Sequence, residues 1–92
     1  MIKHYEHLWE EAEEVADKFY AEESPLQDIG FAATELISDE NLTSEEREEK
    51  LGTIIFGLCA LSKKFDLNAY TALRNAIDNA KIELFDENIN PE

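Results

Sequence analysis

The sequence predicts an all-α fold, a four-helix bundle-like domain. Three observations predict it. Glycine occurs three times and proline twice in 92 residues, the helix formers Ala, Leu, Glu and Lys dominate, and apolar residues recur at steps of three and four. Because 43% of the residues are apolar, the chain can form one core, and its length fits one domain. We expect this domain to span residues 1–85 and a flexible polar tail to follow at residues 86–92.

The first helix is expected from Ile2 to about Ala21. An apolar stripe follows it at helical spacing, made up of Ile2, Tyr5, Trp9, Ala12, Ala16 and Phe19, with Leu8 and Val15 alongside. The other face is acidic and carries Glu10, Glu13, Glu14 and Asp17. Carboxylates three residues apart, as at Glu10 and Glu13, can hold a divalent cation between facing helices. The stripe turns most of these acids outward, however, so we favour a solvated face.

The second helix is expected from Ser24-Pro25 to about Ile37. Ser24 can cap it and Pro25 suits the first helical position. Gln27 would then complete a capping box with Ser24.

The third helix opens at Thr43, and Glu46 three residues later predicts a second capping box. From Ile54 to Leu61 it is almost wholly apolar, and Lys63 then begins its basic end. A helix that is apolar on most sides lies at the centre of a fold or at a subunit interface. We therefore expect this helix to be central or to lie at a subunit interface, and the protein to form a homodimer.

The fourth helix is expected from Ala69 to Phe85, with Asn68 as its cap. Its apolar stripe consists of Tyr70, Leu73, Ile77, Ala80 and Leu84. Because the loops between the predicted helices are short, neighbouring helices should pack antiparallel in a bundle.

Charge is the most unusual property of the chain. Asp and Glu number 22 against eight Lys and Arg, which gives a formal net charge of −14. This charge argues against direct contact with nucleic acid or anionic membranes and favours a basic protein partner or plain solubility. Since no signal peptide and no long apolar run is evident, we expect a cytoplasmic protein without a membrane segment.

Neither cysteine nor histidine predicts chemistry here. Cys59 is the one cysteine, so it cannot form an intramolecular disulfide, and its apolar surroundings favour a small core residue over a nucleophile. His4 and His7 lie near the start of the chain without zinc-ligand spacing. We therefore assign no catalytic residue and no cofactor.

The segment between the second and third helices is strongly acidic. Its acids are Asp39, Glu40, Glu45, Glu46, Glu48 and Glu49. They could dock a basic partner or mimic a phosphate backbone. The alternative, which we favour for the segment alone, is complementation of the helix dipole together with solubility.

Several segments together are similar to the MazG-like, all-α nucleoside triphosphate pyrophosphohydrolase family. The matching segments are Phe31–Leu36, Glu48–Phe56, Phe65–Leu67 and Ala72–Arg74, within a resemblance that covers residues 5–85. The resemblance implies a MazG-like fold. It also implies a magnesium site built from Glu-x-x-Glu on one helix and Glu-x-x-Asp on the next.

The positions that match those metal ligands have lost most of their carboxylates. The first pair falls on Ala32 and Glu35, and the second falls on Lys50 and Thr53. Since one carboxylate of four remains, the resemblance implies a degenerate site. We hypothesise that Lys50 replaces the metal's positive charge and forms an ion pair with Glu35.

Three functions follow from these observations. The first is a non-catalytic, acidic protein-binding or regulatory module on a degenerate MazG-like scaffold. The second is a pyrophosphohydrolase with an unorthodox site, which would need Mg²⁺ held by Glu35, Glu46 and Glu49 and would leave Lys50 to contact phosphate. The third is a DNA-mimicking inhibitor of a nucleic-acid-binding protein, which charge alone supports. We favour the first.

Overall fold

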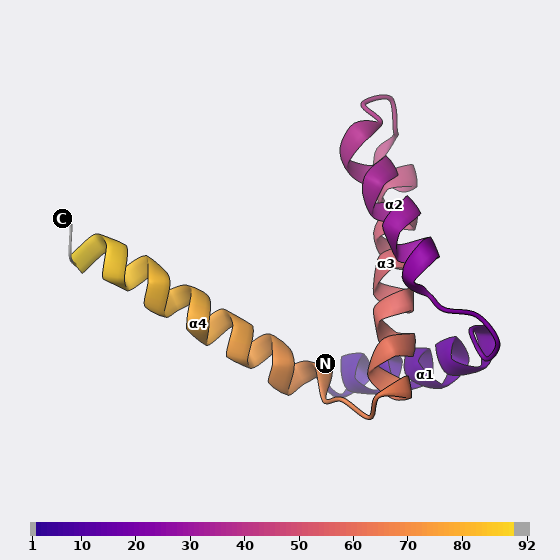
Figure 1. Cartoon of the computed structure of the whole chain (residues 1–92), viewed down its shortest axis with the longest axis horizontal. Coiled ribbons are helices and arrows are strands. Elements are labelled where there is room, and N and C mark those ends of the chain that lie inside the picture. Colours follow the sequence, from indigo (N-terminus) through magenta and orange to yellow (C-terminus); the bar gives the residue numbers. More distant parts are fainter. Residues whose placement is uncertain (1, 90–92) are drawn as a thin grey trace.

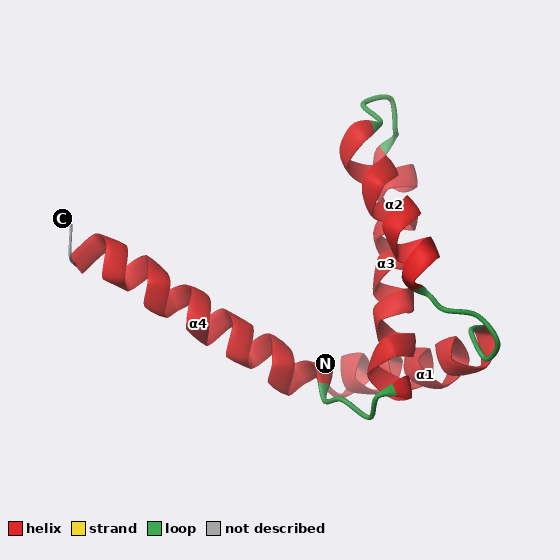
Figure 2. Cartoon of the chain, viewed as in Figure 1, coloured by secondary structure: helices red, strands yellow, loops and turns green. Residues whose placement is uncertain are grey.

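The structure, a computed structural model, describes the backbone of residues 2–89 and the side chains of residues 7–85 (Figure 1). It contains four helices, α1 (Ile2–Phe19), α2 (Leu26–Ser38), α3 (Ser44–Lys64) and α4 (Ala69–Ile89). All regular secondary structure in the described part is helical (Figure 2). The prediction of an all-α protein with four helices is therefore confirmed.

Helix α3 lies at the centre of the packing, as the sequence predicted. It contacts both α1 and α2, and α2 runs antiparallel beside it after the loop at residues 39–43 (Figure 1). The core joins Ala16 of α1 to Cys59 and Ala60 of α3. Partly buried Trp9 and Phe56 pack around these three residues. The three buried residues of this core have small side chains, so the core has a small volume.

A glycine lets α2 approach α3 closely. Gly57 is buried, and a β-carbon placed on it would lie 2.5 Å from Cγ1 and 2.8 Å from Cδ1 of Ile29. No two carbon atoms tolerate such a distance without bonding, so the Ile29 side chain occupies the space that any larger residue would need. Gly57 therefore fixes the separation between these two helices.

Side-chain caps determine two helix starts. Thr43 and Glu46 form the predicted capping box, in which Thr43 Oγ1 accepts from Glu46 N at 3.1 Å and Glu46 Oε1 accepts from Thr43 N at 2.9 Å. Asn68 Oδ1 accepts from Thr71 N at 2.9 Å, so the predicted cap of α4 is also confirmed.

The predicted capping box of α2 does not form. Pro25 occupies the N-cap position with helical backbone angles, and α2 begins at Leu26. Ser24 Oγ accepts from Leu26 N at 3.2 Å, two residues on, which is a local turn contact and not a cap. Gln27 is therefore not part of a reciprocal box.

The end of α3 sets the direction in which the chain leaves it. Leu67 N donates to Ser62 O at 2.8 Å and Asp66 N donates to Lys63 O at 3.2 Å, the two bonds of a Schellman motif. Asp66 has φ 55°, the left-handed conformation that this motif requires at its penultimate position. This turn ends α3 and directs the following segment away from it.

Helix α4 projects away from the other three helices (Figure 1). The radius of gyration is 16.3 Å, whereas a compact chain of this length has about 12 Å. Near its start, Tyr70 contacts Trp9 with ring centroids 6.1 Å apart. The predicted antiparallel packing is therefore seen for α2 and α3, whereas α1 crosses α3 and the described α4 continues beyond them (Figure 1).

Helix α4 also extends past its predicted end. It continues from Phe85 to Ile89, so the predicted flexible tail is helical over residues 86–89, and residues 90–92 lie outside the described residues. Among the described helices, none combines the length and apolar character needed to cross a membrane.

We predict that Gly57→Ala destabilises the protein by about 1 kcal/mol. Alanine would gain up to about 1 kcal/mol from helix propensity, but overpacking against the stiff, β-branched Ile29 costs about 1–3 kcal/mol. The measurement is urea unfolding followed by circular dichroism.

Gly30→Ala provides the matched control, because a β-carbon at Gly30 meets nothing within 4 Å. It should stabilise the protein by about 0.5–1 kcal/mol. The proposed close approach of α2 to α3 is wrong if both alanine variants shift stability in the same direction.

Candidate functional site

The four positions that resemble the metal-ligand pairs lie together in space. Ala32 and Glu35 come from α2, and Lys50 and Thr53 come from α3. They line one shallow hollow of about 170 Å³, which we call the α2–α3 hollow; Asp28 and Phe31 complete its lining. Residues three apart share a helix face, and the close packing of α2 on α3 brings the two faces opposite each other.

An ion pair crosses the α2–α3 hollow. Lys50 Nζ lies 2.5 Å from Glu35 Oε1, with the Lys50 side chain 33% exposed and that of Glu35 55% exposed. The hydrogen bond and charge of Glu35 raise the pKa of Lys50, and Glu49 and Glu46 add to this effect. The one carboxylate at the four matched positions therefore already has a cationic partner.

The pyrophosphohydrolase alternative requires Glu35, Glu46 and Glu49 to lie together around a metal ion. In residues with described side chains, no group of three or more His, Cys, Asp or Glu is placed to hold a metal ion. Glu46 caps α3 through its carboxylate. Ala32 is 5% exposed and has no ligand atom. The α2–α3 hollow thus offers the Lys50 ammonium group, the Glu35 carboxylate paired with it, and the Asp28 carboxylate, which accepts a hydrogen bond from Tyr20.

A hydrogen bond beside the hollow ties α2 to the end of α1. Tyr20 Oη donates to Asp28 Oδ2 at 2.8 Å. Burial, and then Asp28 through this bond and its charge, raise the pKa of Tyr20 to about 12. We did not predict Asp28 as a site residue. Its position seven residues before Glu35 was a usable signal, because two helical turns return a side chain to the same face.

An aromatic cluster lies where α1 crosses α3. Phe19 and Tyr20 contact each other with ring centroids 4.9 Å apart, and both contact Phe56 of α3, at 5.8 and 6.0 Å. These edge-to-face and tilted contacts stabilise the crossing of α1 and α3. They agree with the place of Phe19 in the predicted apolar stripe of the first helix.

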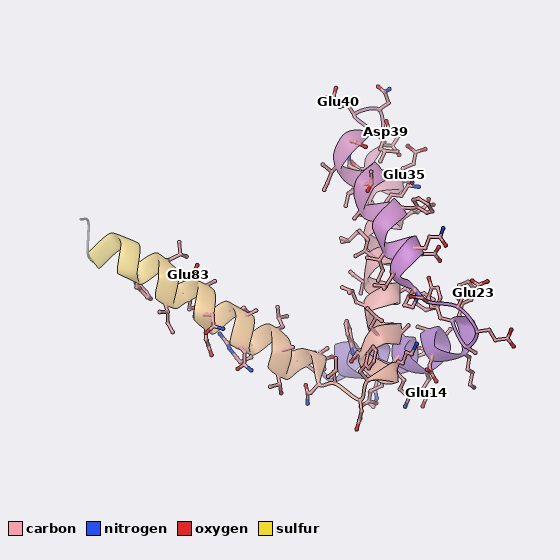
Figure 3. The ribbon with its side chains drawn as sticks, in the orientation of Figure 1. Glu14, Glu23, Glu35, Asp39, Glu40 and Glu83 are labelled. Atoms are coloured by element: carbon pink, nitrogen blue, oxygen red, sulfur yellow. The ribbon has the colours of Figure 1, made fainter. Side chains whose placement is uncertain are left out.

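The acids between α2 and α3 form an exposed surface at one end of the molecule. This acidic tip consists of Asp39, Glu40, Glu45, Glu46, Glu48 and Glu49, all exposed. Figure 3 shows Asp39 and Glu40 at the turn, at the opposite end of the α2–α3 pair from α1. Asp39 Oδ1 accepts from Asn41 N at 3.0 Å, which orders the turn.

Glu13 differs from its predicted outward position. Its Oε2 atom accepts from Trp9 Nε1 at 2.9 Å and lies 2.8 Å from the Ser62 hydroxyl. That hydroxyl is buried and is also 3.0 Å from Leu67 O, so its one hydrogen is shared by two acceptors. Glu13 therefore links α1 to the end of α3, and the prediction that it lies on the solvated face is wrong.

Cys59 is a core residue, as predicted. It is 1% exposed. Burial, followed by the charge of Glu13, raises the pKa of the thiol to about 11. At neutral pH it is a protonated, inaccessible thiol, which makes it a poor nucleophile.

Comparisons with protein-family models, with curated proteins and with solved structures found no match to this chain.

We predict that Tyr20 ionises well above the usual pKa of a tyrosine. Because its folded-state pKa is raised, its contribution to stability is complete below pH 10 and is lost as the pH rises toward 12. In an absorbance titration at 295 nm, Tyr20→Phe should remove the highest-pH transition of the three tyrosines. Loss of a transition near pH 10 instead would show that Tyr20 does not hold its proton in the folded protein.

Proposed function

We propose that this chain is a non-catalytic, acidic protein-binding module on a degenerate MazG-like scaffold, that it acts in the cytoplasm, and that it is a homodimer. The ion pair across the α2–α3 hollow is the observation that carries the non-catalytic part. Lys50 stands 2.5 Å from the one carboxylate at the four matched positions.

The chemistry of magnesium supports this proposal. Mg²⁺ prefers carboxylate oxygens in octahedral geometry, and phosphoryl hydrolysis uses several of them to orient the triphosphate and activate water. In the α2–α3 hollow, Lys50 would repel a divalent cation and would compete with it for Glu35. The grouping of Ala32, Glu35, Lys50 and Thr53 around one hollow supports descent from a scaffold with a metal site at that place.

The acidic tip supports the binding part of the proposal. Six acids lie within eleven residues of the chain, with Arg47 as the one cation before Lys50. An exposed surface with one sign of charge accelerates and orients the approach of a partner with the opposite sign. We propose that the partner is a protein with a basic surface patch, which the acidic tip contacts.

The homodimer is supported by surface that the single chain leaves exposed. Large apolar side chains of α4 are more than half exposed, among them Leu73, Leu84 and Phe85. A contiguous exposed apolar surface on a small protein marks an interaction site.

We predict no release of pyrophosphate from ribo- or deoxynucleoside triphosphates, with either magnesium or manganese. A coupled phosphate assay over a panel of nucleotides measures this directly. Metal-dependent release that disappears in Glu35→Gln would overturn the non-catalytic proposal and would support the pyrophosphohydrolase alternative.

For the binding surface, the test is titration of an arginine-rich peptide. A tip variant carrying Asp39→Asn, Glu40→Gln, Glu45→Gln and Glu48→Gln should bind it about tenfold more weakly. Asn at position 39 keeps the oxygen that orders the turn. The matched control removes four acids elsewhere, through Glu14→Gln, Glu22→Gln, Glu23→Gln and Glu83→Gln. Equal weakening by both variants would show attraction by net charge and no defined surface.

A further inference from the structure

Helix α4 presents an apolar face that the rest of the described chain does not cover. Leu73 and Leu84 are each 60% exposed, and Ile77 is 37% exposed. At 100° per residue these three lie on one face. Ile82 and Phe85 are also exposed and lie on a second face of the later turns. A helix that is apolar on two faces is typical of one packed between other elements.

An apolar groove of matching character lies between α1 and α3. It has a volume of about 600 Å³, and residues that line it include Leu8, Ala12, Ile55 and Phe56. No charged residue is part of its lining. Tyr70, at the start of α4, is also part of its lining. We call it the α1–α3 groove.

The chain exposes more surface than a compact monomer of its mass. Its accessible surface is 7782 Å². A folded monomer of 10.6 kDa exposes about 5,500 Å². The excess is about 2,300 Å² per chain, or about 4,600 Å² for two chains. This total is larger than the ~1,600 Å² of a standard interface and falls in the range of obligate homodimers.

We propose that two copies of this chain exchange α4, so that α4 of each copy lies in the α1–α3 groove of the other. Each chain has one α4 helix and one α1–α3 groove. A two-fold axis between two chains therefore forms the same helix-in-groove contact twice. The lining of the groove has no charged residue, and the α4 face of Leu73, Ile77 and Leu84 carries no carboxylate, so two chains of net charge −14 can meet there. The inference names the interface of the homodimer proposed above and depends on that homodimer.

The turn after α3 favours exchange over closure within one chain. After the Schellman bonds at Ser62 and Lys63 and the left-handed Asp66, α4 leaves the groove of its own chain beyond Tyr70. Folding back would require a different backbone path at Leu67 and Asn68, which lie between α3 and α4. In the exchanged dimer the turn is kept, and the acidic tip remains at the far end of the α2–α3 pair (Figure 1).

Sedimentation equilibrium of the full chain and its variants tests the inference. Wild type should sediment with twice the mass of the 10.6 kDa chain. An α4 variant (Leu73→Gln with Ile77→Gln) and a groove variant (Ile55→Gln) should each weaken dimerisation by at least about tenfold. Ile37→Gln is the matched control, because Ile37 is 82% exposed on α2, outside both surfaces; it should leave the mass unchanged.

Mixing the two interface variants separates exchange from other dimers and from misfolding. The mixed dimer keeps one native contact, in which the unchanged α4 of the groove variant enters the unchanged groove of the α4 variant. The mixture should therefore dimerise more tightly than either variant alone. Two results would overturn the exchange and leave the homodimer proposal in place. The first is that the interface variants still dimerise as wild type does, and the second is that mixing the two variants does not restore dimerisation. A wild-type monomer at all concentrations would overturn both.

Discussion

The contact between Ile29 and the bare backbone of Gly57 is the constraint on which the rest of the structure depends. It sets how closely α2 lies against α3. At that separation the inner faces of the two helices meet, so Glu35 and Lys50 come within ion-pair distance. Larger spacing would leave both side chains in solvent. The geometry of the α2–α3 hollow is thus a consequence of one glycine and one isoleucine.

The same close packing leaves the core small. Buried apolar positions of the described chain include Ala16, Ala32, Cys59 and Ala60, and none of them has a large side chain. Small domains bury a low fraction of their surface and are marginally stable for that reason. Many large apolar side chains are exposed instead, and those on α4 and along the α1–α3 groove form two of the exposed surfaces. A second copy would cover both surfaces at once and would supply the burial that one chain lacks.

Much of the fold could be predicted from the sequence because local signals determine it. Apolar periodicity predicted four helices, and side-chain chemistry predicted the caps at Thr43 and Asn68. The apolar run in α3 predicted its central place. The hypothesis that Glu35 and Lys50 form an ion pair came from the resemblance to a family with a metal site at these positions, and the two groups lie 2.5 Å apart.

Other features could not be predicted because they depend on tertiary contacts. The apolar stripe of α4 predicts which face of the helix is buried. It does not predict whether the same chain or a second copy buries it. Glu13 borders the stripe of α1, and its long side chain bends toward Trp9 and Ser62, which only the crossing of α1 and α3 makes available. The bond from Tyr20 to Asp28 likewise requires the loop at residues 20–25 to bring α1 and α2 together.

Hydrogen exchange of the α4 amides at high and low protein concentration tests the central claim most directly, because a solitary helix of this length is marginal in water. If α4 is stabilised by the groove of a second copy, its amides are protected where the protein is dimeric and lose protection on dilution, before those of α3. Protection of α4 that does not change with dilution would mean that its own chain covers it. Absence of protection at every concentration would mean that nothing does, and either result would contradict the account.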